Sequence, residues 1–158
     1  MVVGVGCFAC PRCHGAVESF AAGYSCSECD VVYPVTAGVP DFAPESSLYW
    51  GELPASAMAE VVDLARRHGY ERAAKAAIEF APGLRPYLLD ISRIDGVFHA
   101  LPEVRGGRCL DIGSGWGTLA RAMTKLYEEV WSLEIVRERL AFQQAFKEFE
   151  GLHNLHLI

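Results

Sequence analysis

Residues 107–117 read Gly-Arg-Cys-Leu-Asp-Ile-Gly-Ser-Gly-Trp-Gly, and the predicted class of fold rests on this segment. Its first part, 108–112, is a short apolar run of the kind that forms a buried parallel strand. Three alternating glycines follow, and after them apolar residues recur at helical spacing over 119–126. Strand, glycine loop and helix in this order are the context in which such a loop approaches a bound cofactor. The sequence therefore predicts an α/β fold.

The spacing of the loop differs from that of a dinucleotide-binding fingerprint. The fingerprint is G-x-G-x-x-G with pyrophosphate at the helix N-terminus. Here the order is Asp111-x-Gly113-x-Gly115-x-Gly117, with the third glycine one position early and an acid at the end of the strand. A carboxylate beside the loop would repel pyrophosphate and would suit a ligand that carries a positive amine.

The following segment predicts a second and a third strand. Residues 130–134 form an apolar run that ends on Glu134, and residues 154–158 begin another strand. Between them a helix is marked by Phe142, Ala145, Phe146 and Phe149. An acid at the end of the second strand can accept two ribose hydroxyls. A glycine-rich turn in some unrelated α/β protein is the alternative.

Together these features resemble the first motif of class I S-adenosylmethionine (SAM)-dependent methyltransferases. The resemblance implies that Asp111 holds the methionine amine of SAM, that the glycines admit the cofactor to the backbone, and that Glu134 binds the ribose. Trp116 either lines the pocket or covers the first turn of the helix. The expected cofactor-binding residues are Asp111, Gly113, Ser114, Gly115, Trp116, Gly117 and Glu134.

Four of the six cysteines form two pairs with the spacing C-x2-C-x12-C-x2-C. This spacing suits a zinc ion held by four thiolates, which leaves no open position and so predicts a structural site. Two disulfides or an iron site are the alternatives, and Cys7 is a spare thiol that could replace a ligand. Cys109 is expected to be a small core residue. The predicted ligands are Cys10, Cys13, Cys26 and Cys29.

Three parts are expected along the chain: a zinc ribbon over 1–44, a helical connector or lid region over 45–105, and the first half of a Rossmann-like sheet over 106–158. The ribbon sequence, with Tyr-Pro-Val and Gly-Val-Pro-Asp-Phe after the second cysteine pair, resembles the N-terminal ribbon of certain bacterial methyltransferases. In the connector, Tyr49–Pro54 is either an apolar clasp or a lid. Helices are expected on both sides of Gly69 and from Tyr87 to Ala100.

Composition limits the partners. The chain has 158 residues, a net charge of -6 and 51% hydrophobic residues, which excludes a disordered tail. No apolar run is long enough to cross a bilayer, and no export signal is visible, so a cytoplasmic protein is expected. The acidic balance disfavours a nucleic-acid partner without excluding one. A protein could dock on the ribbon.

These observations predict methyl transfer from SAM to a small molecule, a sugar or a natural-product intermediate. A ribosomal-RNA methyltransferase and a non-catalytic ribbon module are the alternatives. Only three strands of the expected sheet are visible, so the chain is expected to be a fragment of a longer enzyme and inactive alone. No catalytic residue can be named.

Overall fold

The computed structural model describes residues 8–44, 51–90, 96 and 106–158. The chain divides into two compact units, Met1–Ser46 and Ser47–Ile158. The described residues 51–90, 96 and 106–158 all fall within the second unit. Within the described residues, no helix is long and apolar enough to cross a membrane.

The first unit is an antiparallel sheet of four short strands in the order β1-β2-β3-β4. Its hairpins follow the turn chemistry of the sequence, and Ala37 and Gly38 both have positive φ between the last two strands. The strands are β1 (Glu18–Phe20), β2 (Gly23–Cys26), β3 (Val31–Thr36) and β4 (Val39–Pro40).

The core of this unit is built from aromatic rings and cysteines. Tyr24 and Tyr33 are buried on β2 and β3 beside Cys10 and Cys26. The ring of Phe42 packs 5.6 Å from that of Tyr24 and 5.0 Å from that of Tyr33. So small a core buries little apolar surface, and a unit of this size needs a further restraint to stay folded.

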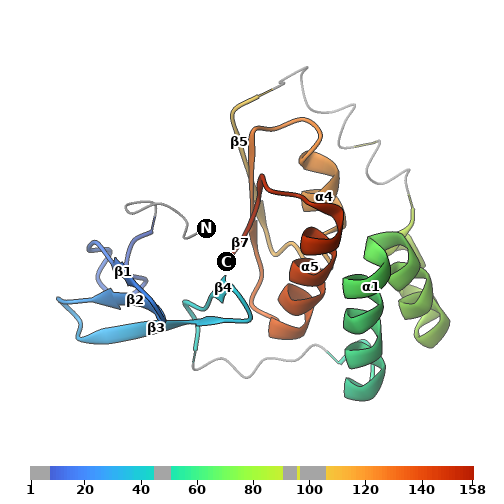
Figure 1. Ribbon diagram of the computed structural model, residues 1–158, viewed down its shortest axis with the longest axis horizontal. Helices are drawn as coiled ribbons and strands as arrows, with labels where there is room; N and C mark the ends of the chain where they lie inside the picture. Colours follow the sequence, from blue (N-terminus) through green and yellow to red (C-terminus); the bar gives the residue numbers. More distant parts are fainter. Residues whose placement is uncertain (1–7, 45–50, 91–95, 97–105) are drawn as a thin grey trace. The chain divides into compact units, whose positions relative to one another are not determined.

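The second unit contains a parallel sheet of three strands in the order β5-β6-β7: β5 (Arg108–Ile112), β6 (Glu129–Leu133) and β7 (Leu155–Leu157). Each crosses to the next through a helix, α4 (Thr118–Met123) or α5 (Arg137–Glu150). Both helices lie on the same side of the sheet (Figure 1). The three predicted strands and the fold class are confirmed.

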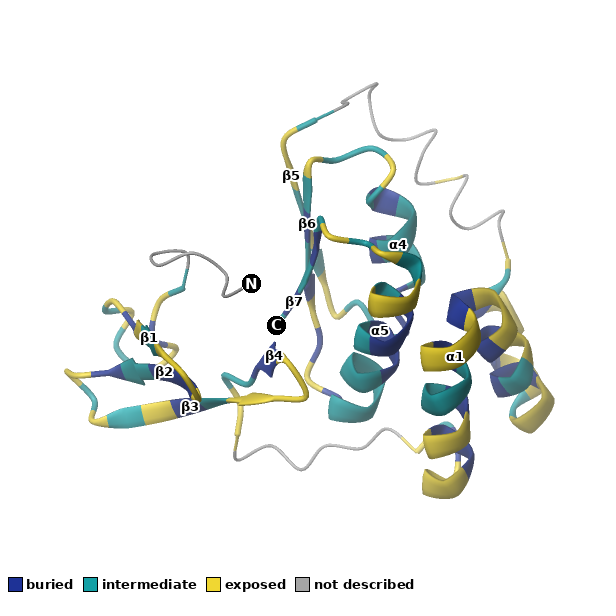
Figure 2. Ribbon diagram, viewed as in Figure 1, coloured by how far each residue is buried: buried dark blue, intermediate teal, exposed yellow. Residues whose placement is uncertain are grey.

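The long helix α1 (Ala55–Phe80) packs on α5 and completes the core. Its buried side chains face Phe142 and Phe146, which are both fully buried. Figure 2 colours the buried residues of the two helices dark blue. Tyr70 contributes its ring to this cluster, with centroids 5.8 Å from Phe142 and 5.2 Å from Phe146.

Helix α1 is broken at Gly69, where φ is 76° and ψ is -174°. This conformation is almost restricted to glycine. The prediction of two helices that meet at this residue is confirmed. The second half has its first backbone amide, that of Tyr70, bonded at 2.9 Å to the carboxylate of Glu150 on α5.

Three sequence predictions need correction. The face of β5 opposite the helices is uncovered by described residues, since Leu110 is 59% and Ile112 71% exposed, so β5 is not a fully buried strand. Cys109 is only partly buried. The helix expected from Tyr87 to Ala100 is interrupted after Leu88, where the short α2 (Arg85–Leu88) ends; α2 follows the 3-10 turn η1 (Pro82–Leu84). Of residues 91–100 only Gly96 is described, and it is helical.

Replacing Gly69 by alanine should lower the free energy of unfolding by about 2 kcal/mol, because the residue is held in a glycine-only conformation. An added Cβ would also lie 2.8 Å from the ring of Phe149. Gly83→Ala is the matched control, since a Cβ there meets no atom within 4 Å. Urea unfolding of both variants measures the difference; equal stabilities would contradict the assigned break.

Candidate functional site

The glycine loop lies between β5 and α4, at the carboxyl end of the strands. Its start is fixed to the end of β6, because the amides of Gly113 and Ser114 donate to the carbonyl of Leu133 at 2.9 and 3.0 Å. Gly113, Gly115 and Gly117 all have positive φ, between 58° and 73°. Side chains other than glycine rarely adopt this backbone, so the three glycines are needed for the path of the loop.

The three glycines differ in what lies beside them. A Cβ added at Gly113 or Gly115 would meet no atom within 4 Å. A Cβ on Gly117 would lie 2.7 Å from the Gln143 side chain. The first two positions therefore keep a backbone surface open, whereas the third allows α4 and α5 to approach closely.

Gln143 holds the loop in place, a role that the sequence pattern does not predict. This fully buried residue accepts a hydrogen bond from the hydroxyl of Ser132 at 2.7 Å. Its amide nitrogen donates to the hydroxyl of Ser114 and to the carbonyl of Gly115, both at 2.9 Å. In the sequence, Gln143 is one polar residue beside the apolar stripe of α5, and such a residue is only a weak indication of a buried role.

Asp111 lies near the end of β5 and carries an orphaned atom. Its Oδ2 is buried and has no hydrogen-bond partner among the described residues. Burial raises the pKa of this carboxyl above its usual value, the backbone amide of Ala120 opposes the rise, and the charge of Glu134 adds to it. A buried carboxylate oxygen without a partner is costly, so a donor, preferably a cation, would stabilise it.

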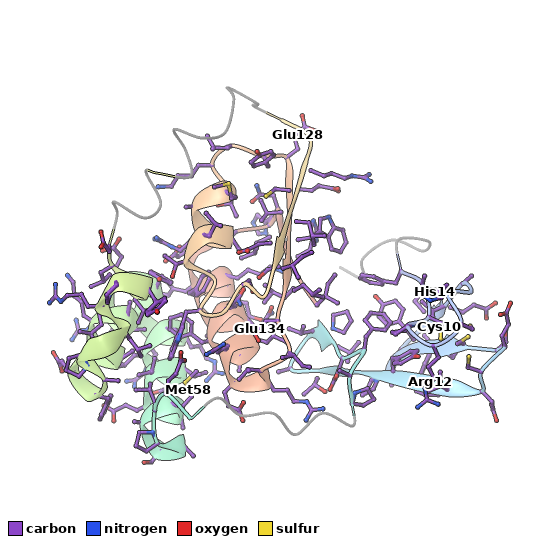
Figure 3. The ribbon with its side chains drawn as sticks, turned by 180° about the vertical axis from the view of Figure 1, so that it is seen from behind. Cys10, Arg12, His14, Met58, Glu128 and Glu134 are labelled. Carbon is purple, nitrogen blue, oxygen red and sulfur yellow. The ribbon has the colours of Figure 1, made fainter. Side chains whose placement is uncertain are left out.

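Glu134 follows β6 and is buried at the same end of the sheet, opposite Glu128 at the strand's other end (Figure 3). Its Oε1 accepts hydrogen bonds from the amides of Ile135 and Val136 at 2.8 and 2.9 Å. Its Oε2 accepts one from the amide of Gly115 at 2.7 Å. The expected ribose acceptor thus already joins the glycine loop to the start of α5.

Trp116 is buried and packs edge-on against Phe142, with ring centroids 5.1 Å apart. Its indole nitrogen donates to Glu52 at 2.8 Å. A small pocket lies here, lined also by Leu53, Met58 and Arg139. Trp116 thus packs on α5 and lines this small pocket. The clasp or lid expected at Tyr49–Pro54 is described only from Gly51 onward.

The four predicted metal ligands come together in the first unit. The sulfurs of Cys10, Cys13, Cys26 and Cys29 all lie within 4.8 Å of one another, and Figure 3 shows Cys10 beside His14. The Cys13–Cys26 and Cys10–Cys29 sulfur separations are 3.6 and 3.9 Å. A tetrahedral site with bonds of about 2.3 Å requires about 3.8 Å. This cluster could hold a metal ion, and all four of its cysteines are free rather than disulfide-bonded.

Tyr33 is a further member of this cluster that the sequence did not indicate. Its hydroxyl lies 3.2 Å from the sulfur of Cys10 and lowers the pKa of that thiol to about 6. The Gly15 amide lowers the pKa of Cys13, but neighbouring thiols and burial raise it to about 12. Because the thiols resist joint ionisation, a cation would stabilise the cluster.

Asp111→Asn should flatten the pH dependence of stability. The folded-state pKa of Asp111 is raised, so its ionised form destabilises the native state, and the wild type should lose stability as pH rises from the ordinary carboxyl pKa through the raised value. Thermal unfolding of the ligand-free protein between pH 4 and 8 measures this. A steeper fall with rising pH in the asparagine variant would contradict it.

No family model and no curated protein matches the chain. Over 42% of its length it is similar to the YcgJ protein from Bacillus subtilis, at 25% identity with a TM-score of 0.39. Over 70% it is similar to DhpI, in a complex with SAH at 18% identity and a TM-score of 0.36 and in a complex with SAM and HEP at 19% and 0.37. The chain covers 29%, 46% and 44% of those three chains, less than half of each.

Proposed function

We propose that the second unit binds SAM and forms the cofactor-binding part of a SAM-dependent methyltransferase. The observation that carries the proposal is the buried, unpartnered Oδ2 of Asp111 at the carboxyl end of the sheet. Ligands of open α/β sheets bind at this end. An acid held there without a partner favours a cationic ligand over a phosphate.

The residues present fit the chemistry of SAM. Asp111 would accept hydrogen bonds from its positively charged methionine amine, and the open backbone at Gly113 and Gly115 would lie against the cofactor. Glu134, buried at the end of the next strand, would accept a ribose hydroxyl. When bound, SAM supplies an electrophilic methyl group on a sulfonium.

The methyl acceptor is proposed to be a small molecule, a sugar or a natural-product intermediate. The net charge of -6 supports this class over a nucleic acid, because nucleic-acid binding depends on cationic side chains that neutralise phosphates. The protein's own contribution to transfer would be to hold the methyl group and the acceptor nucleophile in line.

Asp111→Ala should weaken the binding of S-adenosylhomocysteine (SAH) at least tenfold, because a charge-assisted hydrogen bond is worth more than about 1.4 kcal/mol. Isothermal calorimetry with SAH measures the affinity. Asp63→Asn is the control, since Asp63 lies on the exposed side of α1 and pairs with Arg66 and Arg67. Unchanged affinity in the alanine variant, or no binding by the wild type, would refute the proposal.

We propose that the cysteine cluster of the first unit binds zinc in a structural role. Four sulfurs at tetrahedral separations support this ion, and four protein ligands leave no position for a reacting water. The unit's small aromatic core, centred on Tyr24 and Tyr33, would depend on the ion for its stability.

Purified, reduced protein should contain about one zinc per chain, and chelation should unfold the first unit alone. Far-UV circular dichroism reports on the secondary structure of the whole chain, whereas tryptophan emission reports on the second unit alone, because the first unit holds no tryptophan. Chelation should change the former and leave the latter. Cys26→Ser should lose zinc and Cys109→Ser should retain it; metal-free wild type with a folded first unit contradicts the proposal.

A further inference from the structure

The segment that leads into α1 reaches the candidate cofactor site through Glu52. Its carboxylate pairs with Arg139 on α5 through two contacts, from Nη2 to Oε1 at 2.8 Å and from Nε to Oε2 at 3.3 Å. The same Oε2 accepts the indole proton of Trp116. The forked guanidinium geometry fixes the orientation of Arg139, whose side chain is only 14% exposed.

Arg139 lies between two carboxylates, the partly exposed Glu52 and the buried Glu134. Its Nη1 is 3.6 Å from Oε2 of Glu134, which is too far for a hydrogen bond but close enough for an ion pair. The side chain of Glu134 is only 4% exposed, so water screens its attraction to Arg139 weakly. Arg139 is thus held by Glu52 just short of direct contact with Glu134.

The distance between Arg139 and Glu134 is important because Glu134 has few open acceptor positions. A carboxylate has about four lone-pair positions. The backbone amides of Gly115, Ile135 and Val136 occupy three of them, two on Oε1 and one on Oε2. One position therefore remains, on the oxygen that Arg139 approaches.

We infer that Glu52 is a positioning residue that keeps Arg139 away from the last free acceptor position of Glu134, so that a ribose hydroxyl can bind there. The inference rests on the proposed function. Without the Glu52 charge, Arg139 would move the short distance to Glu134, and its guanidinium would compete with the hydroxyl. Recognition of the ribose by Glu134 would then depend on Glu52, which lies 82 positions earlier in the sequence.

The test uses Glu52→Gln, which removes the charge that holds Arg139 but keeps an acceptor for the indole of Trp116. Binding of SAH and of its 2′,3′-dideoxy analogue is measured by calorimetry. We expect Glu52→Gln to weaken SAH about tenfold and to leave the affinity for the dideoxy analogue within about twofold, since that analogue makes no bond to Glu134. Glu138→Gln, one residue before Arg139, is the matched charge control.

Variants of Arg139 show whether Glu52 acts by holding Arg139 in place or only by packing within the fold. Arg139→Gln alone should not weaken SAH, and the double variant Glu52→Gln with Arg139→Gln should recover the lost affinity. Equal loss for SAH and the dideoxy analogue, or no recovery in the double variant, would overturn the inference while leaving the proposed function intact. No SAH binding by the wild type would overturn both, and thermal unfolding confirms that each variant is folded.

Discussion

The buried amide of Gln143 is the interaction on which the second unit's site depends. It joins β6, through Ser132, to the glycine loop, through Ser114 and Gly115. A fully buried amide must have its hydrogen bonds made, so this side chain fixes the loop in one position relative to the sheet. Gly117 has no side chain because Gln143 fills that space. The side chain of Gln143 thus contacts the strand β6, the glycine loop and the position of Gly117, and holds all three together.

From this anchor the acids of the site acquire different roles. Asp111 has one oxygen without a hydrogen-bond partner among the described residues, whereas Glu134 accepts hydrogen bonds from three backbone amides, keeps one acceptor position open and serves partly as structure. A site that combines a rigid acid with a destabilised one is organised before any ligand arrives, which lowers the ordering cost of binding. A cationic ligand would offset the energetic cost of the buried, unpartnered carboxylate oxygen of Asp111.

Sequence patterns predicted the strands, the loop and the break at Gly69, because each depends on local chemistry: apolar runs, positive φ at glycine and helical spacing. The cysteine pairs likewise predicted the cluster that the structure brings together. Gln143, Glu52 and Arg139 were not predicted, since their roles arise from contacts between segments far apart in the chain. The exposure of Leu110 and Ile112 was missed for a related reason: a run of apolar residues does not reveal whether both faces of a strand are covered.

The carboxylate of Glu150 has a consequence for the order of folding. It accepts the Tyr70 amide at the start of the second half of α1 and pairs with Arg121 of α4 at 2.6 Å. The amides at a helix start need acceptors, and this one lies 80 residues later in the chain. During synthesis from the N-terminus, that half-helix has no such acceptor until α5 has emerged. The second half of α1 therefore gains the acceptor for its first amide only after α5 has been made.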